Sequence, residues 1–367
     1  MRGPRGFMTC CLVLLTVLAA ACTTDAESAT GTVTIAPAAT SSPTVGTTVP
    51  SPSAASGTPP TSDPSPDAVT TTEMSHKELV AWAEEAVAFV DRFHANYRDA
   101  EATFAGFADD ANLFDPSNGD YSVNDKADLV SSWQGFADGF PDLEMRTRDV
   151  FVSPVTVAAR VDVFGLWPSE PIPPDARIPE IRLFRFEDGM ATSFELSYGV
   201  DWLEAYAATC GGAEDCGACF VPETNCGSDL RDLVKKYLEA WSSGDEEAIA
   251  SLYADDATFT DPGLGIEATG ASVIAAIGDG RFWSGHDVCE PLHVYAQTFG
   301  GEGDGRIIGV GIHYRCYPGS PGPWSLEGLA MLELGTRLPD GFEPDPDGLI
   351  VREEVLQDAE DLIRASS

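Results

Sequence analysis

Nine cysteines are the residues of this chain whose type and spacing point most directly to chemistry. Two lie in an apolar N-terminal run and a third follows that run, which leaves an even set of six further along. An even number of cysteines in an exported protein is typical of disulfide bonds. The strand-like segments Asp287–Phe299 and Arg306–Cys316 flank a Gly-rich turn, so a hairpin folded about that turn sets Cys289 opposite Cys316. We predict a disulfide between Cys289 and Cys316.

The remaining four cysteines crowd into one Gly-rich segment with a Cys-x-x-Cys spacing at its centre. They are Cys210, Cys216, Cys219 and Cys226. Four thiolates at such spacing can hold zinc, whereas outside the cytoplasm they are more commonly oxidised. We expect two disulfides, with their connectivity left open. A redox role for the central pair would need a thioredoxin-like strand and helix around it, and the neighbouring sequence has neither.

The five histidines lack the spacing of a metal site, because no two lie four residues apart and no carboxylate stands at ligand spacing. His313 lies on an alternating strand, with Gly309, Gly311 and Arg315 on the same face. The glycines leave room for a ligand beside His313, or they let the sheet curve with an exposed polar pair. We therefore keep His313 as a candidate pocket residue and expect no metal and no cofactor.

The N-terminus has the build of an export signal. Arg2 and Arg5 precede an apolar run from Phe7 to Ala21 that is short for a membrane span. The small residues before Cys22 resemble the lipobox of bacterial lipoproteins, in which this cysteine carries the lipid; the alternative is an ordinary secretory signal that leaves Cys22 free. We expect residues 1–21 to be a lipoprotein signal peptide and the mature protein to be exported and lipid-anchored on the outer face of the cell membrane.

Residues 22–75 have the composition of a disordered stalk. They are mostly Ser, Thr, Pro, Ala and Gly with no aromatic residue, so they bury too little apolar surface to offset the entropy of ordering. The chain as a whole has 59 Asp and Glu against 21 Lys and Arg. Because phosphate recognition needs a basic surface, this acidity excludes nucleic acid as the expected partner.

An internal repeat divides the rest of the chain. Phe107–Pro116 matches Tyr253–Pro262 at a constant offset of 146, with six of ten positions identical. An amphipathic stretch at helical spacing precedes each copy, and each later reaches an Asp-Gly turn between alternating strands. We predict two homologous α+β domains, 76–209 and 227–367, joined by the cysteine-rich connector 210–226. Helices on one face of a strongly curved antiparallel sheet would enclose a pocket in each.

The second copy resembles a known superfamily. Tyr237–Asp245, Leu252–Phe259 and Asp261-Pro262 are similar to the opening helices and first strand of the nuclear transport factor 2-like superfamily, whose SnoaL-like and ketosteroid isomerase branches are nearest. In the first copy the resemblance rests on Phe107–Pro116 and on the strands that flank Asp188-Gly189. The resemblance implies two tandem cone-shaped domains, each with helices wrapped against a bent sheet and a pocket inside.

The resemblance also implies site residues. Ketosteroid isomerases use an Asp general base at the end of the first strand, while a helix Tyr and a protonated late-strand Asp hold the enolate. Asp261 falls on the base position and Tyr237 on the Tyr position, but the third position falls near Ala330, which offers no donor. In the first domain the same positions fall at Asp115, Asp91 and near Arg182.

Several functions remain open at this point, because Asp-Pro is also a good turn former and Tyr237 also fits a core position. We expect the domains to bind a small apolar ligand or a protein partner at the cell envelope, with Trp241, His313 and Asp115 lining the pockets. The alternative is an isomerase or cyclase that acts on a steroid- or polyketide-like carbonyl compound, with Asp261 as general base and Tyr237 as donor. A third is an assembly role, through pairing of the two domains or a homodimer.

Lipidation at Cys22 predicts that Cys22→Ala releases the protein from the membrane, because the substituted residue has no thiol to acylate. Membrane and culture-medium fractions of producing cells measure this directly. A Cys22→Ala protein that stays in the membrane fraction would contradict the lipid anchor.

Overall fold

The computed structural model describes residues 74–114, 122–123, 125–165, 177–209, 226–261, 266–277, 288–299, 306–317, 326–338, 341–344 and 348–366. The predicted signal peptide, the stalk up to residue 73, Cys22 and Asp115 lie outside the described residues. The same holds for Cys210, Cys216 and Cys219 and for the side chain of Cys226, so the disulfides predicted in the connector remain predictions.

The first copy of the repeat forms helices and then strands, as its sequence pattern predicts. Ser75 and Glu78 form a capping box that starts the first helix, and Asp99 and Asp125 cap the next two. The elements are α2 (His76–Ala95), α3 (Ala100–Thr103), β1 (Phe107–Phe114), β2 (Ser122–Val123), α4 (Lys126–Gly139), β3 (Glu144–Val152), β4 (Thr156–Phe164), β5 (Ile178–Glu187), β6 (Met190–Gly199) and α5 (Val200–Thr209).

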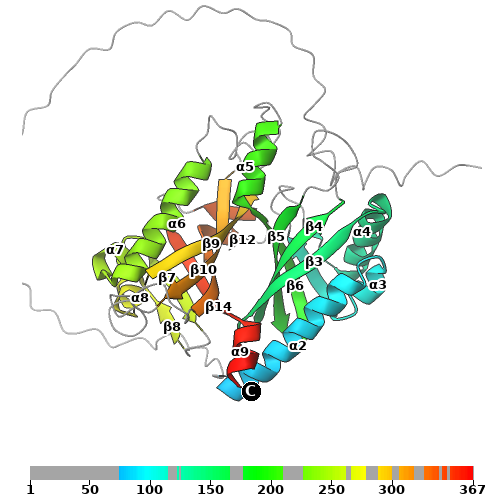
Figure 1. Ribbon diagram of the computed structural model, residues 1–367, viewed down its shortest axis with the longest axis horizontal. Coiled ribbons are helices and arrows are strands. Elements are labelled where there is room, and N and C mark those ends of the chain that lie inside the picture. Colours follow the sequence, from blue (N-terminus) through cyan, green and yellow to red (C-terminus); the bar gives the residue numbers. More distant parts are fainter. Residues whose placement is uncertain are drawn as a thin grey trace, which may run out of the picture. The chain divides into compact units, whose positions relative to one another are not determined.

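The second copy repeats this order and adds two short strands, which form a sheet of their own, before its last long strand. Its elements are α6 (Cys226–Ser243), α7 (Glu246–Ala250), β7 (Tyr253–Asp261), β8 (Ile266–Thr269), α8 (Ala271–Ile277), β9 (Val288–Phe299), β10 (Arg306–Tyr317), β11 (Leu326–Glu333), β12 (Gly335–Leu338), β13 (Gly341–Pro344), β14 (Ile350–Asp358) and α9 (Ala359–Ala365). Each copy thus has helices packed against a curved, largely antiparallel sheet, which confirms the predicted α+β cone fold (Figure 1).

Two hairpins form as the sequence predicts. Asp188 and Gly189 both have positive φ, 50° and 78°, which suits the tight turn between β5 and β6. In the second copy, Cys289 on β9 pairs with Cys316 on β10 across the antiparallel ladder, and the two sulfurs form a disulfide. The predicted Cys289–Cys316 bond is therefore confirmed.

Eight strands of the two copies close into one ring. The order is β3, β4, β5, β6, β9, β10, β11 and β14, with β14 returning to β3, and every neighbouring pair is antiparallel. The copies are joined at two junctions. At one, Tyr198 and Gly199 on β6 pair with β9; at the other, Gln357 and Asp358 on β14 pair with β3. Strands β1 and β7 lie outside the ring and run parallel to β6 and β14, respectively.

The two copies also exchange their last helices. Val200 and Leu203 of α5, which follow the first sheet, pack into the core of the second copy. Ala359 and Leu362 of α9, which follow the second sheet, pack into the core of the first, and α9 lies beside α2 (Figure 1). Each core is therefore completed by a helix of the other half of the chain.

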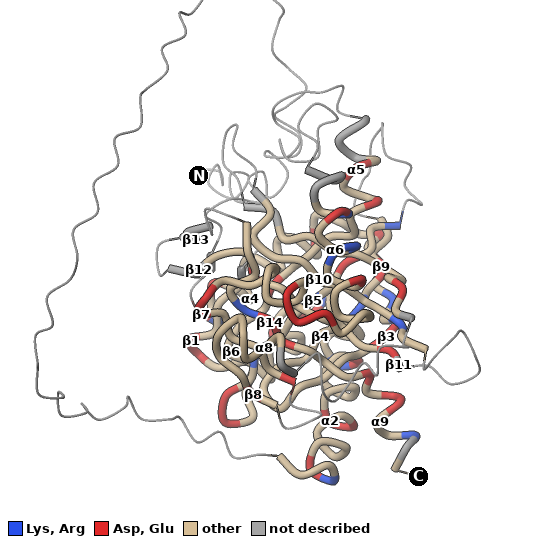
Figure 2. The backbone as a smooth tube through the Cα atoms, turned by 90° about the vertical axis from the view of Figure 1, so that its left-hand side faces the viewer, with Lys and Arg blue, Asp and Glu red and all other residues tan. Residues whose placement is uncertain are grey.

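Buried apolar residues form three clusters that follow this arrangement. One fills the first cone and one fills the second. The third, between the two sheets, contains residues of both copies: Phe151, Ala158, Ile181, Leu183, Tyr295, Leu329, Met331 and Leu356. We call the β6–β9 and β14–β3 junctions together with this third cluster the seam. Outside these clusters the described surface carries its acidic residues on many helices and strands of both copies (Figure 2).

Candidate functional site

A carboxylate that the sequence did not single out organises the polar interior of the second cone. Glu353 on β14 is completely buried, and its Oε1 accepts a hydrogen bond of 2.6 Å from the hydroxyl of Tyr237 on α6. Its Oε2 accepts a second hydrogen bond from the hydroxyl of Tyr253, at the start of β7. The two phenols thus approach the same carboxyl group from different elements.

Trp241, a predicted pocket residue, orients one of these phenols. Its indole Nε1 donates to the hydroxyl of Tyr253 at 3.1 Å, which leaves the Tyr253 proton directed at Glu353. The Trp241 ring also stacks on Phe259, with centroids 5.5 Å apart. Trp241, Tyr237 and Tyr253 are each at most 5% exposed, so this chain of hydrogen bonds lies away from solvent.

Asp261, the predicted base, belongs to the same interior. It ends β7 and is buried. Burial raises the pKa of Glu353 and of Tyr314 on β10, and the nearby charge of Asp261 adds to both rises. Gly328 faces Tyr314 across the β10–β11 ladder, and a Cβ there would lie 2.7 Å from the Tyr314 hydroxyl. The glycine therefore makes the space that this third phenol occupies.

Burial sets the protonation of this cluster. Burial raises the pKa of Glu353 to about 7; the hydrogen bonds from Tyr237 and Tyr253 oppose the rise, and the charge of Asp261 adds to it. Burial together with the Glu353 charge raises the pKa of both phenols well above 10, so they remain donors. Two neighbouring carboxyl groups, one of which holds its proton near neutral pH, can bind a polar ligand group or exchange a proton with one.

The first cone has a different interior. Eight buried aromatic rings contribute to it, and Phe184 and Phe194 stack with their centroids 5.1 Å apart. The eight are Phe89, Phe93, Phe104, Phe107, Trp133, Phe140, Phe184 and Phe194. Arg182, at the late-strand position, is buried there, donates to Glu180 at 2.9 Å and lies over the Trp133 and Phe194 rings. The described part of this cone is thus largely an aromatic core.

Strand registers and helix ends show how the two interiors diverged. Glu353 pairs in parallel with Phe259, and Phe194 pairs in the same way with Leu113, the repeat equivalent of Phe259. Phe194 therefore stands where the second copy has Glu353. Likewise, Phe107 stands where the second copy has Tyr253.

The Tyr position of the first cone is not at Asp91, as the constant offset of 146 predicts. Helix α2 ends at Ala95 and α6 at Ser243, so along these helices the offset is 148 and Phe89 is the equivalent of Tyr237. Asp91 is exposed on α2. The two extra residues lie in the turn that precedes the helix cap Asp99. The equivalent turn of the second copy, before the cap Asp245, is two residues shorter.

His313, a second predicted pocket residue, does not join the Glu353 cluster. Tyr314, its neighbour on β10, faces the second cone, whereas the His313 ring packs 5.1 Å from Phe151 of the first copy, at the seam. It is 2% exposed, so the interpretation of His313 and Arg315 as an exposed polar pair is wrong for the histidine. Burial lowers the pKa of His313 to about 4, which keeps the ring neutral.

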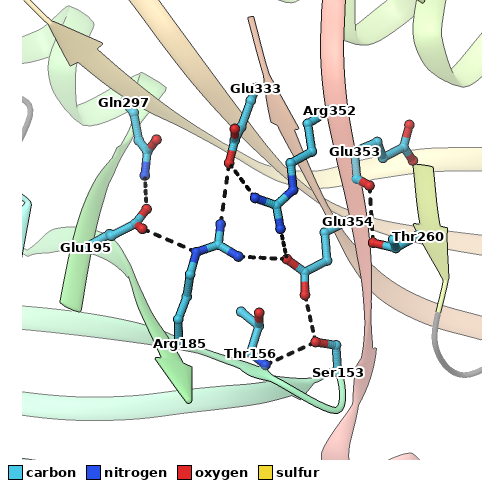
Figure 3. Close-up of polar contacts among 10 residues, drawn as sticks. All are labelled: Ser153, Thr156, Arg185, Glu195, Thr260, Gln297, Glu333, Arg352, Glu353 and Glu354. Carbon is cyan, nitrogen blue, oxygen red and sulfur yellow. Dashed lines mark hydrogen bonds and ion pairs between the residues drawn. The ribbon is translucent and has the colours of Figure 1, made fainter. Parts of the chain in front are cut away.

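The sequence did contain a signal for Glu353. Strand β14 reads Ile-Val-Arg-Glu-Glu-Val-Leu, and three consecutive charged residues inside a buried strand need partners on both faces. Alternation sends Glu353 and Glu354 to opposite sides of the strand (Figure 3). The pattern indicates a buried acid, although it does not identify the phenols that contact it.

The described residues contain no group of three or more His, Cys, Asp or Glu side chains placed to hold a metal ion. Among the helices of the described segments, none combines the length and the apolar character that crossing a bilayer requires.

The raised pKa of Glu353 predicts a pH-dependent stability. The folded protein holds this proton up to about pH 7, whereas the unfolded chain releases it near 4.5, so the free energy of unfolding falls as pH rises between these values. The loss is on the order of 3 kcal/mol. Glu353→Gln does not titrate and should lack this contribution to the slope in denaturant unfolding from pH 4.5 to 7.5.

Glu247→Gln, an exposed change on α7, is the matched control and should keep the wild-type slope. A Glu353→Gln protein with the same pH dependence as wild type would show that Glu353 is already ionised throughout this range.

Comparison with known proteins agrees with the fold. The SnoaL-like domain family matches residues 86–194 and 234–337, one match in each copy of the repeat. A search among curated proteins found no significant match.

Among solved structures, an NTF2-like protein of unknown function from Cytophaga hutchinsonii is 12% identical, with 36% of this chain and 98% of that chain covered and a TM-score of 0.24. A hypothetical protein with a ketosteroid isomerase-like fold from Catenulispora acidiphila, in complex with trimethylamine, is 19% identical; the coverage is 34% of this chain and 92% of that chain, with a TM-score of 0.28. The two family matches together span more than half of the sequence, and the chain therefore belongs to the SnoaL-like domain family.

Proposed function

We propose that the second cone binds a small, mostly apolar ligand that carries a hydrogen-bonding group, and that the first cone serves as its structural counterpart. The observation that carries this proposal is the completely buried Glu353, which accepts hydrogen bonds from Tyr237 and Tyr253 beside Asp261. Two neighbouring buried carboxyl groups cost more free energy of desolvation than an apolar core of equal volume, and we take binding of a ligand to be what they provide in return.

The charges of the second cone limit the class of ligand. Both of the charged side chains that the described residues bury in this interior, Asp261 and Glu353, are acidic. An anionic ligand would meet two carboxyl groups, so we infer that the ligand is neutral or cationic. Trp241, Phe259 and the tyrosines supply flat apolar surface for its remaining atoms.

A second candidate function follows from the proximity of the two carboxyl groups. If Asp261 is ionised while Glu353 keeps its proton, Asp261 has the properties of a general base and Tyr237 or Glu353 those of a donor to a carbonyl oxygen. This supports an isomerase or cyclase that moves a proton beside a carbonyl. In the structure, however, both Tyr237 and Tyr253 donate to Glu353, so a substrate oxygen would have to replace that contact.

We further propose that the protein acts at the outer face of the cell membrane, anchored through Cys22. This part of the proposal rests on the N-terminal sequence alone, on the basic residues, the apolar run and the small residues before Cys22. The stalk that follows would hold the two cones away from the membrane.

Ligand binding predicts that the protein, purified from its native membrane, carries a neutral or cationic small molecule detectable by native mass spectrometry. Tyr237→Phe and Glu353→Gln should each weaken its binding about tenfold and so lower its occupancy, as expected for the loss of one buried hydrogen bond worth about 1.5 kcal/mol. Asp91→Asn, an exposed change in the first copy, should leave occupancy unchanged. Protein that carries no small molecule from that source would overturn the binding function.

The catalytic alternative predicts turnover of a 3-keto-steroid enone by the full chain, followed by ultraviolet absorbance. Asp261→Asn should lower the rate by at least about 100-fold, because it removes the base. Activity that persists in Asp261→Asn, or no activity across a panel of such enones, would exclude this mechanism.

A further inference from the structure

Arginine side chains neutralise the buried carboxylates of the seam and of the first cone. In the seam, Arg185 lies 3.5 Å from Glu195 and 3.1 Å from Glu354. In the first cone, Arg182 donates to Glu180 at 2.9 Å, and both side chains are buried. In both places a cation from the chain itself lies beside the buried negative charge, which offsets the cost of removing that charge from water.

Phenols meet the buried carboxyl group of the second cone instead. Glu353 precedes Glu354 on β14 and points to the opposite side of the strand, away from Arg352, which approaches Glu354 at 3.5 Å (Figure 3). The two oxygens of Glu353 accept hydrogen bonds from Tyr237 and Tyr253, which carry no positive charge. Among the described residues, no buried Lys, Arg or His side chain belongs to the core of the second cone. The described part of this cone therefore supplies no cation to match Glu353.

Aromatic rings surround this carboxyl group. The Trp241 ring stacks on Phe259 at 5.5 Å, and its centroid lies 6.2 Å from that of Tyr237. Tyr253 and Tyr314 supply two further rings, and all five side chains are buried. The face of an aromatic ring carries a negative potential and attracts a cation. The rings and the carboxyl group thus give the interior a negative potential.

Asp261 makes a cation a better ligand than a neutral molecule. Its charge adds to the effect of burial in holding the proton on Glu353. A neutral ligand leaves these two carboxyl groups facing each other as before, whereas a cation beside them relieves their repulsion and lets Glu353 ionise. A hydrogen bond from a charged N–H group to a carboxylate is also about twice as strong as one between neutral groups.

We propose that the ligand of the second cone is a protonated amine with an apolar body, and that its charge takes the place of the proton on Glu353. This inference rests on the proposed binding function and narrows its ligand from neutral or cationic to cationic. The ammonium N–H groups donate to the carboxylates of Glu353 and Asp261, and the aromatic rings contact the apolar body. The Glu353 O–H bond breaks on binding, and its proton passes to the solvent.

This exchange gives binding a defined pH dependence. The titratable groups that face Glu353 in the described structure are Tyr237 on α6, Tyr253 and Asp261 on β7, and Tyr314 on β10. Burial raises the pKa of all three phenols above 10, so they keep their protons. Below about pH 7 the free protein holds the Glu353 proton, and an amine must displace it. Above that pH the carboxylate is already ionised, so binding releases no proton.

Calorimetric titration of the full chain tests the proposal with benzylamine, cyclohexylamine and hexylamine, each compared with the alcohol of the same shape. We expect at least one amine to bind about tenfold more tightly than its alcohol near pH 8. Titrations in buffers of different ionisation enthalpy count the protons released. We expect roughly one proton per bound amine near pH 5.5, almost none near pH 8.5, and none for the alcohols at either pH.

Variants of the two carboxyl groups separate charge recognition from packing. Glu353→Gln should abolish the proton release and weaken amine binding about tenfold, with alcohol binding changed by no more than about twofold. Asp261→Asn should also weaken the amine more than the alcohol, and it serves as the test if Glu353→Gln does not fold. Glu247→Gln, the exposed control on α7, should change neither affinity nor proton release.

Several results would overturn the inference and leave the binding function standing. They are equal affinity for amine and alcohol, amine binding without proton release near pH 5.5, and a neutral molecule carried by the protein from its native membrane. Failure of all three amines to bind would overturn it as well. Protein that carries no small molecule from that membrane would instead contradict the binding function itself.

Discussion

The placement of buried charge is the constraint on which the rest of this structure depends. Each described carboxyl group discussed above gives up its hydration, so it must find a donor inside the protein or keep its proton. Glu353 does both, and Glu195 and Glu354 find Arg185, Gln297 and Ser153. Burial alone would lower the pKa of Arg185, but the carboxylates around it outweigh that effect and hold the pKa above its ordinary value.

Strand β14 connects the two buried systems. Successive residues on a strand face opposite sides, so Glu353 reaches the second cone while Glu354 reaches the seam. The same strand pairs with β11 in its own copy, with β7 outside the ring, and with β3 of the first copy. The strand that carries Glu353 is therefore held at its end by the first copy, through the β14–β3 pairing.

Duplication explains why the two cones differ. One copy can keep an aromatic core, with Phe194, Phe107 and Phe89 at positions where the other has Glu353, Tyr253 and Tyr237. Such a division is open to fused copies but not to a symmetric dimer of identical chains, because that dimer carries the same residues on both sides.

Much of the fold could be predicted from local pattern. The repeat at Phe107–Pro116, the Asp188-Gly189 turn and the register of Cys289 with Cys316 each depend on residues close in sequence or symmetric about one turn. The closure of the ring and the exchange of α5 and α9 could not be predicted, because they depend on contacts between segments about 100 to 200 residues apart. Only part of the site could be predicted, because its residues also come from segments that are far apart in the sequence.

Tyr237 and Asp261 were found through resemblance, whereas the carboxyl group beside them, Glu353, comes from a strand some 90 to 120 residues later. The resemblance places the late-strand donor near Ala330 on β11, which has no polar side chain. The neighbouring strand β14 supplies the carboxyl group of Glu353 instead. The offset of 146, taken from the repeat at Phe107–Pro116, also placed the first-cone equivalent of Tyr237 at Asp91 instead of Phe89. The turn after the first helix is two residues longer in the first copy, so every position on that helix is shifted by two.

The central claim is that Glu353 keeps its proton near neutral pH while it accepts hydrogen bonds from two phenols inside a buried acidic site. The most direct measurement is a carboxyl infrared or carbon-13 NMR titration of the full chain, with the signal assigned by its loss in Glu353→Gln. The account predicts a protonated carboxyl at pH 6 that titrates near pH 7. A Glu353 signal that titrates near 4.5, like an exposed glutamate, would contradict it.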